Sequence, residues 1–214
     1  MRIFIGIDLD PEIRARIERF LDGVQALAPD ARWVRPESLH ITLKFIGEQT
    51  AEQVDALSER LQVIVSEAFD IHVEGYGFFP TATAPRVFWI GIDGGPQLTK
   101  LAATVDAAAA ELGIVREDRP YSPHLTLARA GGRSGSPKWR TGDGPNNIFA
   151  ALEKRLSAMS EMKFGAMRAT EFVLYQSQPS AGGSKYTKLK RFALGTIQST
   201  DPIDAAPHPT ESNP

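Results

Sequence analysis

The chain contains no cysteine among its 214 residues. A disulfide framework, a thiolate nucleophile and a cysteine-ligated metal site are therefore excluded. This absence agrees with a reducing compartment, so we expect a cytoplasmic protein. The chain also lacks an apolar run long enough to span a bilayer, and its first eight residues alternate like a strand rather than forming a signal sequence. No membrane association is expected.

Neither sign of charge is in excess, since 24 basic residues face 26 acidic ones and the formal net charge is −2. This balance excludes broad electrostatic capture of nucleic acid, so any such contact should be local, as at a chain end. The hydrophobic share of 42% is that of an ordinary globular protein. A monomer is the default expectation.

Four segments carry apolar residues at helical spacing, and eight others alternate or are rich in β-branched residues. The predicted helices are 11–27, 51–68, 98–112 and 149–159. The predicted strands are 1–8, 33–35, 40–46, 69–79, 86–93, 124–129, 169–177 and 186–194. This order predicts an α+β fold in which helices cover the outside of two antiparallel sheets.

The organisation repeats along the chain. A strand with His40-Ile41-Thr42-Leu43 is followed by a helix and a strand pair, and the same order recurs after His124-Leu125-Thr126-Leu127. A duplicated, bilobal fold would place the two motifs face to face across a central cleft. We expect one domain over residues 1–197 and a disordered tail, rich in proline, over 198–214.

Strand geometry gives the two motifs their chemistry. In a strand, side chains two residues apart emerge on the same face roughly 7 Å apart, so His40 stands beside Thr42 and His124 beside Thr126. Phosphodiester cleavage needs one group to accept a proton and another to donate one, which two imidazoles can do near neutral pH. The two threonine hydroxyls can donate hydrogen bonds to phosphate oxygens. This scheme needs no metal and no cofactor, and it predicts a bell-shaped dependence of kcat/KM on pH around neutrality.

Other candidates for substrate binding are Arg129, Lys44, Phe45 and Tyr121. Arg129, two positions beyond Leu127 at the end of its strand, and Lys44, expected on the face of His40 and Thr42, could clamp a phosphate or simply be solvated. Phe45 and Tyr121 could stack on a base, although core packing is an equal alternative for Phe45. The Gly/Ser/Pro-rich segment 131–145, with Trp139, is a candidate flap. His72 is expected to face solvent, and His208 to be incidental.

The chain resembles the 2′-5′ RNA ligase and RNA 2′,3′-cyclic phosphodiesterase family of the two-histidine phosphoesterase superfamily. The matching segments are Arg2–Asp8, Trp33–Gly47, Pro123–Arg129, Leu174–Ser177 and Tyr186–Thr187. The resemblance implies a bilobal fold and hydrolysis of an RNA 2′,3′-cyclic phosphate end to a 2′-phosphate. It also implies that His40 is the proton donor and His124 the proton acceptor. Some members of the family also join RNA through a 2′-5′ bond without ATP.

Two other functions compete with this interpretation. A zinc or iron enzyme would use the histidines as ligands, but no His-Glu pair joins them at ligand spacing. A non-catalytic module could use the same cleft to bind phosphorylated RNA ends. Binding alone would not require a pair of proton-transfer groups.

Overall fold

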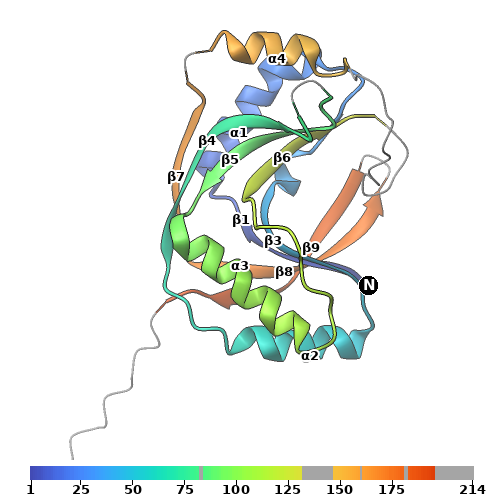
Figure 1. Cartoon of the computed structure of the whole chain (residues 1–214), viewed down its shortest axis with the longest axis vertical. Helices are drawn as coiled ribbons and strands as arrows, with labels where there is room; N and C mark the ends of the chain where they lie inside the picture. The colour runs from blue at the N-terminus through green and yellow to red at the C-terminus, as the bar shows by residue number, and fades with distance from the viewer. Residues whose placement is uncertain (82–83, 132–146, 160, 181–182, 196–214) are drawn as a thin grey trace, which may run out of the picture.

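The computed structural model describes residues 1–81, 84–131, 147–159, 161–180 and 183–195, and its strands form two antiparallel sheets (Figure 1). Sheet A has the strand order β3 (His40–Glu48), β1 (Arg2–Asp8), β8 (Glu171–Ser180) and β9 (Gly183–Ala193). Sheet B has the order β2 (Arg32–Trp33), β6 (His124–Arg129), β5 (Val87–Asp93), β4 (Phe69–Phe79) and β7 (Lys163–Ala169). The predicted α+β class with two antiparallel sheets is confirmed.

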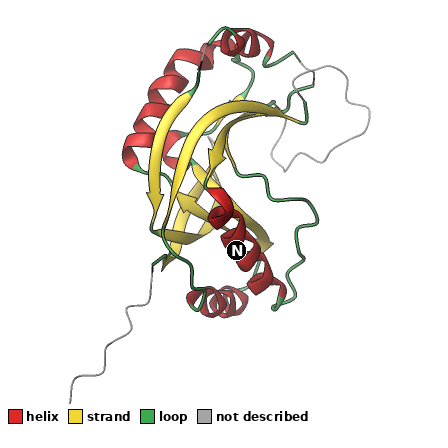
Figure 2. Ribbon diagram, turned by 60° about the vertical axis from the view of Figure 1, so that its left-hand side comes forward, coloured by secondary structure: helices red, strands yellow, loops and turns green. Residues whose placement is uncertain are grey.

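The helices are α1 (Pro11–Val24), α2 (Ala51–Gln62), α3 (Gly95–Ala110) and α4 (Ala150–Ser157), and they lie on the outside of the strands (Figure 2). Capping side chains fix where the first two begin. The carboxylate of Asp10 accepts hydrogen bonds from the first turn of α1, and Thr50 forms a capping box with Gln53 at the start of α2. None of the described helices is long and apolar enough to cross a membrane.

Two helices cross from one sheet to the other. Helix α1 follows β1 of sheet A but packs on β7 of sheet B, where the rings of Phe20 and Phe164 lie 5.3 Å apart. Helix α3 follows β5 of sheet B but packs on β3 of sheet A. The buried faces of both sheets therefore contribute to one continuous hydrophobic core, which ties the two halves together.

The internal repeat extends beyond the two histidine motifs. The segments Ile5–Asp8 and Ile90–Asp93 have the same sequence, Ile-Gly-Ile-Asp, and each leads into a helix that carries a proline at its start. A Cβ atom on Gly6 would lie 2.7 Å from the carbonyl oxygen of Ile41, and one on Gly91 would lie 2.5 Å from that of Glu74. Both glycines therefore allow a close backbone approach, which is a physical reason for the matching sequences.

Strand β7 was missed by the sequence analysis, which placed the first of the last two strands at 169–177. Its alternation is broken at Gly165, which has a φ of 120° and lies beside a register shift in the pairing of β4 with β7. The second helix is also shorter than predicted and ends at Gln62. The predicted flap at 131–145 and the tail at 198–214 fall outside the described residues, apart from Gly131.

Candidate active site

Each motif strand contains a β-bulge at the leucine that ends its motif. In the pairing of β1 with β3, Gly6 lies opposite Thr42 but Ile5 lies opposite Lys44, so Leu43 is an extra residue. In the pairing of β5 with β6, Leu127 is the extra residue in the same way. A bulge shifts the alternation of side chains by one residue. The residue five positions after each histidine therefore returns to the face of that histidine.

The bulge at Leu43 corrects the prediction for Lys44. Instead of sharing a face with His40, Lys44 lies opposite the core residue Ile5, and its side chain is 5% exposed. Its ammonium group donates hydrogen bonds to the carboxylate of Asp106 on α3 and, at 3.0 Å, to the carbonyl oxygen of Val115. The prediction that Lys44 shares the face of His40 and Thr42 is therefore wrong. Phe45, the next residue along β3, lies on that face instead.

His40 is held by a carbonyl group and three aromatic rings. Its Nδ1 lies 2.9 Å from the carbonyl oxygen of Ser38, and the ring centroid lies 4.5 Å from Phe4, 5.0 Å from Tyr186 and 6.0 Å from Tyr175. Because a carbonyl oxygen can only accept, Nδ1 carries a proton and Nε2 is left for proton transfer. Burial lowers the pKa of His40 to about 4, against the opposing effects of the Ser38 hydrogen bond and the Asp8 charge.

His124 has the same arrangement on sheet B. Its Nδ1 lies 2.7 Å from the carbonyl oxygen of Ser122, and its ring lies 5.1 Å from Phe79 and 6.3 Å from Trp89. Burial lowers the pKa of His124, the Ser122 hydrogen bond raises it, and the positive charge of Arg129 lowers it further. Both imidazoles are therefore favoured as neutral groups near pH 7 while the site is empty.

Several contacts connect the two histidine motifs. Strands β3 and β6 contact each other, and the hydroxyl of Tyr121 donates a hydrogen bond of 2.9 Å to the backbone oxygen of Thr42. Arg129 lies close enough to both imidazoles for its charge to lower the pKa of His40 as well as that of His124. One guanidinium group thus acts on both motifs.

The other predicted site residues differ in their surroundings. Thr42 and Thr126 are partly buried, and within the described part of the chain neither hydroxyl has a hydrogen-bond partner. Phe45 is 64% exposed on the face of His40, whereas Tyr121 packs against the core and braces Thr42. Most of the Phe45 ring is therefore open to solvent, and its centroid lies 5.9 Å from that of Phe4.

Other predictions from the sequence concern His72, His208, Trp139 and a metal site. His72 faces solvent on β4, as predicted, whereas His208 and Trp139 fall outside the described residues. No group of three potential metal ligands occurs among the described residues.

Four residues that lie beside His40 were not predicted from the sequence: Asp8, Tyr175, Tyr186 and Lys188. Asp8 is the register partner of His40, and its carboxylate binds both Arg14 on α1 and Lys188 on β9. Alternation along β8 and β9 could have placed Tyr175 and Tyr186 on a shared face. Which histidine that face meets depends on the order of strands in sheet A, which the sequence does not state.

The family described as LigT-like phosphoesterase matches the chain in two segments, 7–89 and 90–186. These segments divide the chain between the two copies of the repeat. An RNA 2′,3′-cyclic phosphodiesterase of Archaeoglobus fulgidus is 33% identical over 192 residues, which cover 90% of this chain and 99% of that protein. An enzyme with the same description from Escherichia coli K12 is 33% identical over 196 residues, covering 90% of this chain and 96% of its own.

Solved structures of the same family share the fold of this chain. Escherichia coli LigT in complex with 3′-AMP superposes with a TM-score of 0.70 at 30% identity, covering 91% of this chain and 98% of that one. The structure of E. coli LigT with ATP gives a TM-score of 0.67 at 28% identity with the same coverage. Nucleotides are therefore bound by proteins that share this fold over nearly their whole length.

Proposed function

The chain belongs to the LigT-like phosphoesterase family, and we propose that it hydrolyses RNA 2′,3′-cyclic phosphate ends to 2′-phosphate ends with His40 as proton donor and His124 as proton acceptor. The observation that carries this proposal is the matched setting of the two imidazoles. Each gives its Nδ1 to a backbone carbonyl, each leaves its Nε2 for proton transfer, and both lie near Arg129.

In the proposed reaction a water molecule attacks the phosphorus while Nε2 of His124 takes its proton. The bond between phosphorus and the 3′ oxygen breaks, and that oxygen receives a proton from Nε2 of His40. The hydroxyls of Thr42 and Thr126 and the guanidinium of Arg129 donate hydrogen bonds to the phosphate oxygens that gain charge. The step requires one protonated and one neutral imidazole.

Substrate binding supplies the condition for that protonation. Burial favours the neutral form of both histidines in the empty site. A bound phosphate brings a negative charge next to both rings, which favours the imidazolium form. The enzyme therefore takes up its catalytic proton together with its substrate. ATP-independent 2′-5′ ligation would be the same ring opening with the 5′-hydroxyl of a second RNA in place of water, so that the bond between phosphorus and the 3′ oxygen breaks as the 2′-5′ linkage forms.

Product analysis tests the proposal. Incubation with an RNA that ends in a 2′,3′-cyclic phosphate should give a 2′-phosphate and no 3′-phosphate, and His40→Ala and His124→Ala should each abolish turnover. Unchanged turnover in His40→Ala would exclude the assignment. Wild-type protein that binds the RNA without converting it would instead establish the non-catalytic binder, and loss of activity in a strong chelator would favour a metal enzyme.

A further inference from the structure

A pocket of about 220 Å³ lies beside His40 on sheet A. Its lining includes Asp8, Arg14, Ser38, Tyr175 and Lys188, with His40 at one side. These residues come from β1, α1, the turn before β3, β8 and β9. Apart from His40, they take no part in the proton transfers described above.

The buried hydroxyl of Tyr175 is the first indication that the pocket binds a ligand. The residue is 4% exposed, and within the described part of the chain its buried hydroxyl has no hydrogen-bond partner. A buried hydroxyl without a partner loses its hydrogen bonds to water and gains none in return, so such groups are rare unless a ligand satisfies them. Burial also raises the pKa of Tyr175, so the phenol keeps its proton and remains a donor.

The charges give the second sign. Asp8 accepts a hydrogen bond of 2.6 Å from Arg14 and another from Lys188, so a single carboxylate balances two cations. Although burial raises the pKa of Asp8, the hydrogen bond from Lys188 and the charge of Arg14 hold it below its usual value, so Asp8 stays ionised. The formal charges of the lining cancel, since Arg14 and Lys188 face the carboxylates of Asp8 and Glu37, but both cations keep N–H donors beyond those that they give to Asp8.

Ammonium, guanidinium and phenol groups can all donate hydrogen bonds, so the partner that fits them is an acceptor, and an anionic oxygen forms the strongest of these bonds. A phosphodiester of the RNA backbone has this chemistry. On the proposed function, the cyclic phosphate at the 3′ end occupies the two histidines, and the RNA can continue only from the 5′ oxygen of the terminal nucleotide. The next phosphate of the chain is then one nucleotide away from His40.

We propose that this pocket binds the phosphodiester on the 5′ side of the terminal nucleotide, with Tyr175, Lys188 and Arg14 as its donors. The proposal rests on the proposed function and specifies its substrate class. The protein selects an RNA oligonucleotide with a cyclic end over an isolated cyclic nucleotide, because only the oligonucleotide fills both phosphate positions.

Three substrates test the pocket: a nucleoside 2′,3′-cyclic phosphate, the same compound with a 5′-phosphate, and a dinucleotide with a 2′,3′-cyclic end. In the wild type, kcat/KM should rise about tenfold from the first to each of the other two, mainly through a lower KM, since a charge-assisted hydrogen bond supplies about that much. Tyr175→Phe and Lys188→Met should each reduce this gain severalfold.

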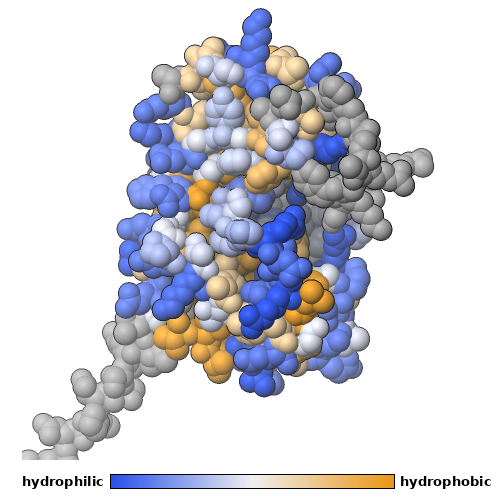
Figure 3. Space-filling model, viewed as in Figure 1, coloured by the Kyte–Doolittle hydropathy of each residue, from blue (hydrophilic) through white to orange (hydrophobic). Residues whose placement is uncertain are grey.

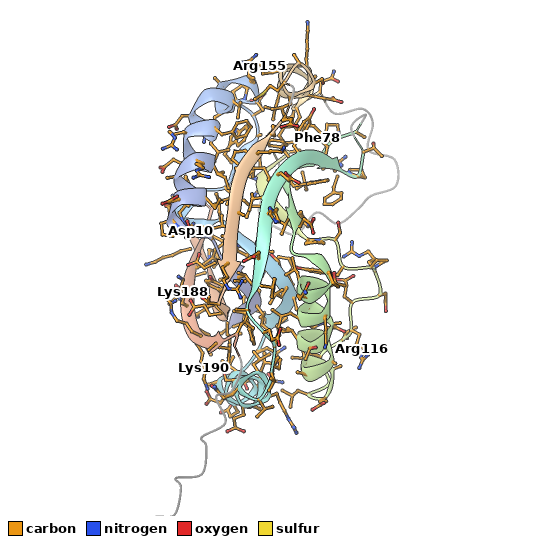
Figure 4. All side chains as sticks on the ribbon, turned by 90° about the vertical axis from the view of Figure 1, so that its left-hand side faces the viewer. Asp10, Phe78, Arg116, Arg155, Lys188 and Lys190 are labelled. Carbon is orange, nitrogen blue, oxygen red and sulfur yellow. The ribbon has the colours of Figure 1, made fainter. Side chains whose placement is uncertain are left out.

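Lys190→Met is the matched control. Lys190 lies on the same strand as Lys188 (Figure 4), but it is paired opposite the core residue Leu174, and its ammonium lies 5.7 Å from the ring centroid of Phe192. Its loss removes the same charge from β9 and should keep the wild-type gain. Thermal unfolding gives a second readout, since Tyr175→Phe removes an unpaired hydroxyl and should leave stability unchanged or higher.

Several outcomes would overturn the proposal. A gain seen with the dinucleotide but not with the 5′-phosphate would assign the preference to the upstream nucleoside. An equal loss on all three substrates in Tyr175→Phe would make the pocket part of the catalytic site. If the wild type turns over none of them, the proposed function fails by itself, and titration with a 5′-phosphorylated nucleotide then decides whether the pocket binds phosphate.

Discussion

Phe45 and Arg129 occupy equivalent positions in the two halves of the molecule, each five residues after its histidine and beyond a β-bulge. The equivalence is one of backbone position, since one residue is an exposed aromatic ring and the other a partly buried cation. The two halves thus place an aromatic ring and a guanidinium group at equivalent positions of the duplicated frame.

Arg129→Gln should lower kcat/KM for a cyclic-phosphate substrate by about ten- to a hundredfold, the value of a hydrogen bond to a charged group. The same substitution should raise the pKa of both histidines, because the charge of Arg129 lowers both. Proton NMR titration of the imidazoles measures the second effect. Arg168→Gln, which removes an exposed arginine of sheet B paired with Asp70, is the control and should change neither quantity.

The pH dependence should differ from the bell around neutrality that the sequence suggests. Since kcat/KM reports the free enzyme, and burial lowers both histidine pKa values there, its maximum should lie below pH 6.5. Above that maximum, kcat/KM should fall about tenfold per pH unit as the single catalytic proton is lost. The profile of kcat should lie at higher pH because bound phosphate favours the imidazolium form. A kcat/KM maximum at pH 7 or above would contradict this.

Gly77→Ala should reduce activity by moving Trp89. A Cβ atom at position 77 would lie 2.2 Å from Cζ2 of that indole, whose ring stands 6.3 Å from His124 and 5.1 Å from Phe79. The indole must therefore shift, and the support of His124 shifts with it. We expect kcat to fall severalfold with the fold retained, as measured by turnover and circular dichroism. Gly23→Ala on α1, where an added Cβ meets nothing within 4 Å, should behave like the wild type.

Lys44→Met should destabilise the fold by about 2 kcal/mol, because it leaves Asp106 without its buried partner. Turnover per folded molecule should stay the same, since Lys44 faces away from His40. Denaturant unfolding and active-site-normalised rates measure the two effects. Arg60→Gln is the control. It breaks an ion pair with Glu111 in which both side chains are more than half exposed, so it should lower the free energy of unfolding by only a few tenths of the loss in Lys44→Met. A large loss of turnover in Lys44→Met would restore its predicted role.

The surface is mainly hydrophilic on the face shown in Figure 3, with apolar patches in its lower half. A second pocket, of about 370 Å³, lies beside Phe45 and is lined by residues that include Leu112 and Val115. Exposed large apolar residues include Val63, Val65 and Val115. Nothing in the described part of the chain indicates what would cover them.

The sequence by itself determined the parts that follow from local periodicity. Alternation in His40–Leu43 and His124–Leu127 was enough to place each histidine beside its threonine over buried aliphatic residues, because a strand has only two faces. The repeat of that pattern predicted a duplicated α+β fold, and hydrophobic spacing located the helices. These features depend on residues close together in the chain.

Tertiary structure decided everything that depends on pairing between distant strands. The bulges at Leu43 and Leu127 exist only against β1 and β5, and they bring Phe45, in place of Lys44, and Arg129 to the faces of the two histidines. The partners of Asp8 arrive from α1 and β9, far apart in sequence. Burial, which sets the histidine pKa values, arises only when the sheets and their aromatic residues have assembled.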